Sequence, residues 1–188
     1  MKYKMAAAGQ LLTIITMLSI CKSTYNWPRD VPDISKFYNR SAIIWTVNTT
    51  METGRRCKVD YVNDTTPTYT DFLRVDSLDN STYKEDLRGW FIHMDNTRRS
   101  PPYNGMNVRT KGEGMYQSTE ELLFEYDDYA CGVFSVRLST TRGTFYEIRL
   151  KEPFVRTPNK KCIQEFEKHK YETVTALYSE SCRLIQYH

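Results

Sequence analysis

Short runs of alternating polar and apolar residues, the pattern of β-strands, recur along most of the chain and are separated by turn-forming residues. Of all features of the sequence, this recurrence limits the possible folds most strongly. We predict strands at residues 41–50, 56–62, 69–75, 87–94, 106–110, 121–126, 130–138 and 144–151. Residues 160–172 have the spacing of an amphipathic helix, and residues 33–38 that of a short helix capped by Asp33. This order predicts an all-β fold with a C-terminal helix, an eight-stranded antiparallel up-and-down barrel, with a jelly roll or sandwich as the alternative.

The first 23 residues have the pattern of a signal peptide. Lys2 and Lys4 precede an uncharged apolar run at residues 11–20, and Cys21 and Ser23 are the small residues before the expected cut. The run is too short for a membrane span, which takes about 20 residues; a buried N-terminal helix is the alternative. No later stretch is apolar enough for membrane insertion. We therefore predict a signal peptide at residues 1–23 and a secreted, extracellular single domain at residues 24–188.

Loss of the signal peptide changes the charge of the chain. The full sequence has 26 basic and 23 acidic residues, a formal net charge of +3. Three of the basic residues, Lys2, Lys4 and Lys22, leave with the signal peptide, and no acidic residue does. The remaining charges balance, so composition gives no support to nucleic-acid binding, which needs a clustered positive field.

Four cysteines remain after cleavage: Cys57, Cys131, Cys162 and Cys182. An even number in a secreted chain predicts two disulfides, and spacing alone leaves all three pairings open. A metal site is the rival interpretation, but these cysteines lack the close pairs that zinc sites use, and the histidines are scattered. We therefore expect no metal and no cofactor.

The sequence contains four Asn-x-Ser/Thr sequons, at Asn39, Asn48, Asn63 and Asn80. In a secreted chain such sequons predict N-glycosylation and exposed surface. No catalytic motif is present, neither a nucleophile elbow nor a phosphate-binding loop nor a zinc-protease helix. We therefore expect a protein that is not an enzyme.

Alternation along the strands gives a first set of candidate interior residues. If the sequon Asn48 points outward, Ile43, Trp45 and Val47 point inward. Leu122 and Phe124 are inward candidates on the sixth strand. The last two predicted strands are ambiguous, and alternation by itself favours the solvent face for the Glu and Arg of the eighth. The candidates on these two strands are Gly132, Phe134, Phe145, Glu147 and Arg149.

The sequence resembles the tick salivary lipocalins of the histamine-binding protein superfamily. The resemblance is carried by YEIRL at 146–150, CIQEF at 162–166, residues 178–182, YACGVF at 129–134 and residues 45–62, together with the order of the four cysteines. It implies an eight-stranded barrel with the pairings Cys57–Cys182 and Cys131–Cys162. It also implies that Gly132, Phe134, Glu147 and Arg149 face the interior, which reverses the expectation from alternation for the last strand.

Members of this family bind histamine, serotonin, leukotrienes, fatty acids or sterols, and some, such as the Japanin-like members, modulate host immune cells. The amine binders resemble one another in a Cys-Asp pair on the seventh strand and in Glu-Leu-Trp on the eighth. Here the corresponding residues are Cys131-Gly132 and Glu147-Ile148-Arg149, so one acid is missing and a cation replaces an aromatic ring. The departure counts against an ammonium ligand, which needs carboxylates and aromatic faces.

The resemblance therefore implies a monomeric salivary protein that binds a small hydrophobic ligand, a sterol, fatty acid or eicosanoid-like molecule, and modulates host immunity or inflammation. Two alternatives stay open. One is a scavenger of biogenic amines that uses Glu147 differently. The other is an immunomodulator that binds an immune-cell surface or plasma protein through exposed loops near Arg98-Arg99 and Pro101-Pro102-Tyr103, with the barrel as scaffold.

Overall fold

The structure is a computed structural model that describes residues 31–79, 81–95, 100–170 and 173–184. These residues belong to one compact unit, Val31–His188. The predicted signal peptide, the sequon Asn80 and the pair Arg98-Arg99 lie outside the described residues. None of the described helices is long and apolar enough to cross a membrane.

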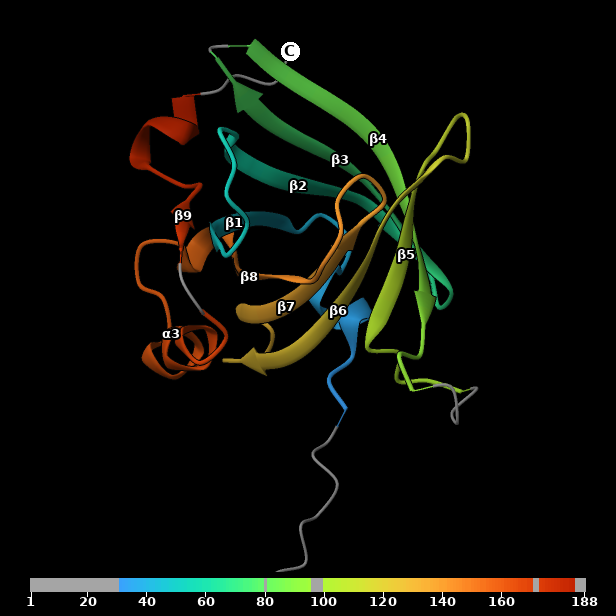
Figure 1. The fold of residues 1–188 in the computed structure, drawn as a ribbon. Coiled ribbons are helices and arrows are strands. Elements are labelled where there is room, and N and C mark those ends of the chain that lie inside the picture. The colour runs from blue at the N-terminus through green and yellow to red at the C-terminus, as the bar shows by residue number, and fades with distance from the viewer. Residues whose placement is uncertain (1–30, 80, 96–99, 171–172, 185–188) are drawn as a thin grey trace, which may run out of the picture. The chain divides into compact units, whose positions relative to one another are not determined.

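An antiparallel sheet closes on itself to form a barrel (Figure 1). Each strand pairs with its neighbour in sequence, and β1 pairs with both β8 and β2, which closes the ring. The strands are β1 (Ile43–Thr49), β2 (Arg56–Thr65), β3 (Tyr69–Leu78), β4 (Ser81–Ile92), β5 (Gly105–Thr110), β6 (Tyr116–Tyr126), β7 (Cys131–Leu138) and β8 (Phe145–Lys151). The predicted barrel is therefore confirmed, and the sandwich is ruled out by the β1–β2 pairing.

β2 and β3 each extend three residues beyond their predicted ends, and two other strands begin well before their predicted first residue. β4 begins at Ser81 rather than at residue 87, because β3 pairs with it continuously from Tyr69↔Trp90 to Leu78↔Ser81. β6 likewise begins at Tyr116, where it pairs with Arg109 of β5. In both cases a polar segment becomes a strand because its neighbour supplies backbone hydrogen-bond partners, which a local pattern does not reveal.

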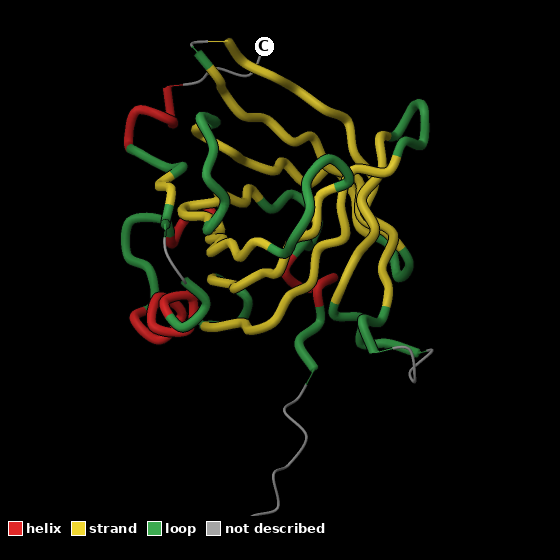
Figure 2. The backbone as a smooth tube through the Cα atoms, in the orientation of Figure 1, coloured by secondary structure: helices red, strands yellow, loops and turns green. Residues whose placement is uncertain are grey.

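Helices are short and lie around the strands (Figure 2). α2 (Ile34–Phe37) is capped by Asp33, whose side chain accepts from the Ser35 N–H, as predicted. It lies at one end of the barrel, where the Ile34 N–H donates to the Tyr103 carbonyl and the Asp33 N–H donates to the Tyr129 hydroxyl oxygen at 3.1 Å. We call this the closed end, because Ile34 and Phe37 are completely buried there.

α3 (Lys160–Glu167) covers the outer face of β6, β7 and β8 and buries Cys162 and Phe166. Its N-cap is Asn159, whose side chain accepts from the N–H groups of Lys161 and Cys162. The helix ends earlier than the predicted residue 172. After it, β9 (Thr175–Ala176) adds to β1, and the 3-10 helix η3 (Glu180–Leu184) contains Cys182.

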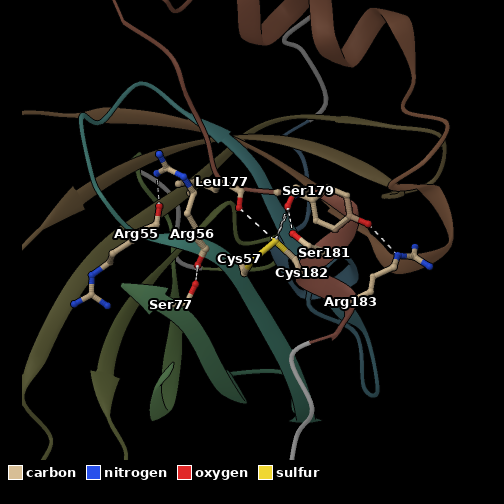
Figure 3. The surroundings of a disulfide bond; sticks show 10 residues. Arg55, Arg56, Cys57, Ser77, Leu177, Ser179, Ser181, Cys182 and Arg183 are labelled. Carbon is tan, nitrogen blue, oxygen red and sulfur yellow. Dashed lines mark hydrogen bonds between the residues drawn. A yellow bond between two sulfur atoms is a disulfide. The ribbon is translucent and has the colours of Figure 1, made fainter. Parts of the chain in front are cut away.

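Two disulfides fasten this C-terminal region to the barrel, with the pairing that the resemblance implied. Cys131 of β7 is bonded to Cys162 of α3, and Cys57 of β2 to Cys182 of η3 (Figure 3). The bonds close stretches of 31 and 125 residues. By restricting the unfolded chain, such bonds typically contribute about 2–4 kcal/mol each to stability.

The strands separate two buried layers, because neighbouring side chains on a strand point to opposite faces. The outer layer lies beneath α3 and the tail and includes Trp45, Val133, Leu150 and Phe166. The inner layer fills the barrel and includes Ile44, Phe72, Leu122 and Phe134.

Candidate functional site

Charged side chains occupy the middle of the barrel. We call the following residues the interior charge cluster: Tyr38, Lys58, Asp60, Arg74, Glu120, Glu147 and Arg149. Tyr38 follows α2, and the others come from β2, β3, β6 and β8. The cluster contains three cations and three carboxylates, so its formal charge balances, as buried charges require.

Arg149 links both glutamates of the cluster. Its guanidinium is completely buried and donates from Nη1 to Glu120 Oε2 at 2.5 Å and from Nε to Glu147 Oε2 at 2.8 Å. Nη1 also donates to the Tyr38 hydroxyl at 2.6 Å, and the guanidinium lies 4.4 Å from the centre of the Phe134 ring. Fixed charge-assisted hydrogen bonds of this kind hold Arg149 in one position.

Arg74 forms the second centre of the cluster. It makes a bidentate contact with Asp60, at 2.7 and 2.8 Å, and donates to Glu120 Oε1 at 2.8 Å. The Tyr38 hydroxyl donates to Asp60 Oδ2 at 2.8 Å and so connects the two arginines. Burial acts to raise the pKa of Glu120, but Arg149 and Arg74 outweigh it and hold that pKa well below its usual range.

Lys58 completes the cluster through Glu147, with 2.7 Å between Nζ and Oε1. Burial acts to raise the pKa of Glu147, but Lys58 and Arg149 outweigh it and lower the pKa to about 2. Burial lowers the pKa of Lys58, against the opposing effect of Glu147. The Glu147 carboxylate is therefore ionised at neutral pH, and an ammonium group already lies against it.

Aromatic and aliphatic side chains fill the closed end. Phe37 and Phe134 meet edge to face, with 5.0 Å between ring centres, and Tyr38 lies 5.4 Å from the Phe72 ring. Gly132 is needed here because an added Cβ would come within 2.7 Å of Phe37 and 2.9 Å of both Leu122 and Phe134. This part of the interior is therefore packed as a protein core.

A pocket of about 190 Å³, which we call the mouth pocket, lies at the opposite end of the barrel. It is lined by Arg55, Arg74, Asp76, Tyr83, Lys84 and Glu85. Arg55 pairs with Asp76 at 2.5 Å and lies over the Tyr83 ring. Because Arg74 belongs to both the mouth pocket and the interior charge cluster, the pocket leads from the surface to the cluster.

The structure corrects the predicted orientation of the first strand. Ile43, Trp45 and Val47 lie in the outer layer, whereas Ile44 belongs to the inner layer. The prediction failed because the register between β1 and β8 shifts between Thr46 and Asn48, so the parity of Asn48 does not extend to the earlier residues. Trp45 instead packs edge to face on Tyr178 and donates from Nε1 to the Glu152 carboxylate.

Phe124 also lies in the outer layer, which contradicts its predicted inward orientation. A register shift between Leu122 and Phe124 is the reason, and Leu122 on the other side of it faces inward as predicted.

The expectation from alternation that Glu147 and Arg149 face solvent is wrong as well, since both are buried in the cluster. The inward placement of these two residues, Gly132 and Phe134 agrees with the resemblance. Phe145 is half-buried at the start of β8.

Sequence reasoning missed most of the interior charge cluster. Tyr38, Lys58, Asp60, Arg74 and Glu120 were not candidates, yet alternation carried a signal for some of them. On β2, Lys58 and Asp60 alternate with Val59 and Tyr61, which lie in the outer layer. From the sequence alone, such a pattern predicts that the polar side chains face solvent. Here the C-terminal region covers the outside of the barrel, so the apolar side chains point outward and the polar ones inward.

The predicted glycosylation sites differ in exposure. Asn39 and Asn63 are exposed, and Asn48 is half-buried within β1.

Within the described part of the chain, no group of three or more His, Cys, Asp and Glu residues is arranged to hold a metal ion.

No family model matches the chain, and no curated protein matches its sequence. Solved structures do match. Japanin from Rhipicephalus appendiculatus, solved bound to cholesterol, superposes with a TM-score of 0.53 at 11% identity, covering 80% of this chain and 100% of that chain. The siderocalin Ex-FABP, described as functioning through dual ligand specificities, gives a TM-score of 0.53 at 11% identity, covering 74% and 94%. Together with the closed barrel and the short helix after β8, these superpositions identify the fold of the chain as that of the lipocalins.

Proposed function

We propose that the chain is a secreted lipocalin-type carrier, not an enzyme, that binds a small hydrophobic molecule with one polar end inside its barrel. The observation that carries the proposal is the closed barrel, which has the fold of a structure solved with cholesterol and whose mouth pocket leads to a buried hydrogen-bonding cluster. The two disulfides support an extracellular location. The signal peptide and membership in the tick salivary family remain predictions.

The balanced charge of the cluster supports a ligand whose polar end is a hydroxyl. A carboxylate entering through the mouth pocket competes with Asp60 and Glu120 for Arg74, and an ammonium group competes with Lys58 for Glu147. Each such ligand separates an existing buried ion pair, which is costly. A hydroxyl only adds a hydrogen bond, so among the candidate ligands the cluster favours a sterol over a fatty acid or an eicosanoid-like acid.

The mouth pocket is smaller than the roughly 300–1,000 Å³ typical of ligand sites. Binding of a sterol-sized molecule therefore requires its lining side chains to move. Arg55 and Tyr83 are exposed side chains of this lining, and neither takes part in the buried hydrogen bonds that fix Arg149. We infer that they move when the ligand enters.

Native mass spectrometry of the chain secreted from animal cells, followed by organic extraction, tests the proposal. We expect an extractable lipid, and after its removal we expect cholesterol to bind more tightly than a fatty acid of similar size. Arg74→Met is expected to weaken the remaining fatty-acid affinity by roughly tenfold, because one charge-assisted hydrogen bond is lost. The surface variant Arg156→Met is the control. A barrel that carries no lipid and takes up none contradicts the proposal.

The biogenic-amine alternative is tested by calorimetry with histamine and serotonin. Because the Lys58 ammonium already lies 2.7 Å from the Glu147 carboxylate, we expect no heat from either amine. Modulation of host immune cells is the further part of the proposal, and it rests on the resemblance. A pull-down from leukocytes with lipid-free and lipid-loaded protein separates a ligand-dependent effect from a protein-binding scaffold.

A further inference from the structure

A groove of about 380 Å³ lies on the outside of the barrel, where the chain enters β1 and leaves β8. Its lining includes Asn39, Ile43, Lys151, Pro153 and Phe154. Because Ile44 pairs with Lys151 across β1 and β8, the turn before β1 and the 3-10 helix η2 (Glu152–Phe154) after β8 lie side by side. The groove is separate from the barrel interior and from the interior charge cluster.

Asn39 lies at this groove in a fixed orientation. The Lys151 ammonium donates to Asn39 Oδ1 at 2.7 Å and to the Lys36 carbonyl at 3.0 Å. The Ala42 N–H donates to the Asn39 carbonyl and closes a turn through the sequon Asn39-Arg40-Ser41. The side chain of a glycosylation sequon is thus part of the groove wall.

The remaining groove wall combines apolar and charged groups. Phe154 is 43% exposed, and Pro153 beside it is exposed as well. Arg40, which pairs with Asp64 at 2.9 Å, and Glu152 supply hydrogen-bonding groups at the same groove. A pyranose ring has this same combination of an apolar C–H face and hydroxyl groups at its edge.

We propose that an N-linked glycan on Asn39 places its first sugar residues in this groove, against Phe154 and Pro153. In the attachment step the amide nitrogen loses a proton, forms a bond to the anomeric carbon of the oligosaccharide and displaces the lipid pyrophosphate of a lipid-linked donor. Oδ1 stays an acceptor after this step, so the bond from Lys151 is retained. The inference rests on the secretion that is part of the proposed function.

A thermal-unfolding cycle tests the contact between glycan and groove. The full chain with Asn48→Gln, Asn63→Gln and Asn80→Gln is secreted from animal cells, and an endoglycosidase trims the remaining glycan to one sugar. Ser41→Gly gives the glycan-free background, because it removes the sequon and suits the φ of 65° at Ser41. Ser41→Ala is a second such background. Both keep Asn39 and its contact with Lys151.

We expect Phe154→Ala to lower the Tm by about 2–4 °C more in the glycosylated protein than in the glycan-free protein. Trp90→Ala is the matched control, since Trp90 is also 43% exposed but lies on β4, and it is expected to shift both backgrounds equally. Equal effects of Phe154→Ala in the two backgrounds overturn the proposal. So does secreted protein whose glycopeptide map shows Asn39 unmodified. Neither result bears on lipid binding, whereas failure of the chain to be secreted contradicts both proposals.

Discussion

Arg149 and Leu150 are neighbours on β8, and both are almost completely buried, but on opposite faces of the same strand. Leu150 lies in the outer layer, where α3 and two disulfides cover apolar side chains. Arg149 lies in the interior charge cluster, where burial is compensated by ion pairs. The outer layer is held by apolar burial and covalent bonds, whereas the middle of the barrel is held by complete pairing of its charges. The two faces should therefore respond differently to substitution and to pH.

The largest effect is expected from removing one member of the cluster. Arg149→Met leaves Glu120 and Glu147 without their shared partner and should lower the free energy of unfolding by about 3–5 kcal/mol. Urea denaturation at pH 7 measures it. Adding Glu120→Gln removes one uncompensated charge and should restore part of the loss. If the double variant is no more stable than Arg149→Met, unpaired charge is not the cause.

The outer layer should depend strongly on its covalent bonds. Replacing Cys57 and Cys182 together by Ala should cost about 2–5 kcal/mol of unfolding free energy. Replacing Cys131 and Cys162 should cost about 1 kcal/mol less, because that bond closes 31 rather than 125 residues. Denaturation of both variants under the same conditions checks the order, and the reverse order would show that native-state contacts of the tail outweigh chain entropy.

Acid should weaken the cluster and leave the apolar outer layer unchanged. The pKa of Glu147 is about 2 in the folded protein, below its ordinary value of 4.5, so its ionised form stabilises the fold above pH 4.5. This contribution is lost progressively as the pH falls from about 4.5 toward about 2. Glu147→Gln should therefore be less stable than the parent at pH 7 by a few kcal/mol, with a gap that narrows in acid. A gap independent of pH contradicts the assignment.

The smallest effect is expected at an ion pair outside both layers. Arg156 and Glu180 pair at 3.0 Å with side chains 64% and 61% exposed. Arg156→Met should change the free energy of unfolding by less than about 1 kcal/mol, because water screens the pair. The contrast with Arg149→Met, measured under the same conditions, isolates the contribution of burial. A similar loss for both variants would contradict the comparison between the two faces.

The barrel interior was only partly accessible from the sequence pattern. Alternation placed Leu122 correctly, before the register shift in β6, but it assigned Glu147 and Arg149 of the regularly paired strand β8 to the solvent face. It failed after a shift, as for Phe124, and it failed when one residue was used to set the parity of a whole strand, as Asn48 was used for β1. A single extra residue reverses which face each later side chain occupies, and no local property of the sequence marks where the extra residue lies.

The sequence by itself determined the class of the fold, the order of its strands and the short capped helix before β1. These features follow from periodicity, turn residues and a cap, which act over a few neighbouring residues. Tertiary structure decided which polar residues are inside. Asp60, Arg74 and Glu120 have the alternation of a solvent-facing edge, and they become buried because the sheet closes around them. Charged residues on four different strands then become ion-pair partners, and that pairing depends on the register of the closed barrel.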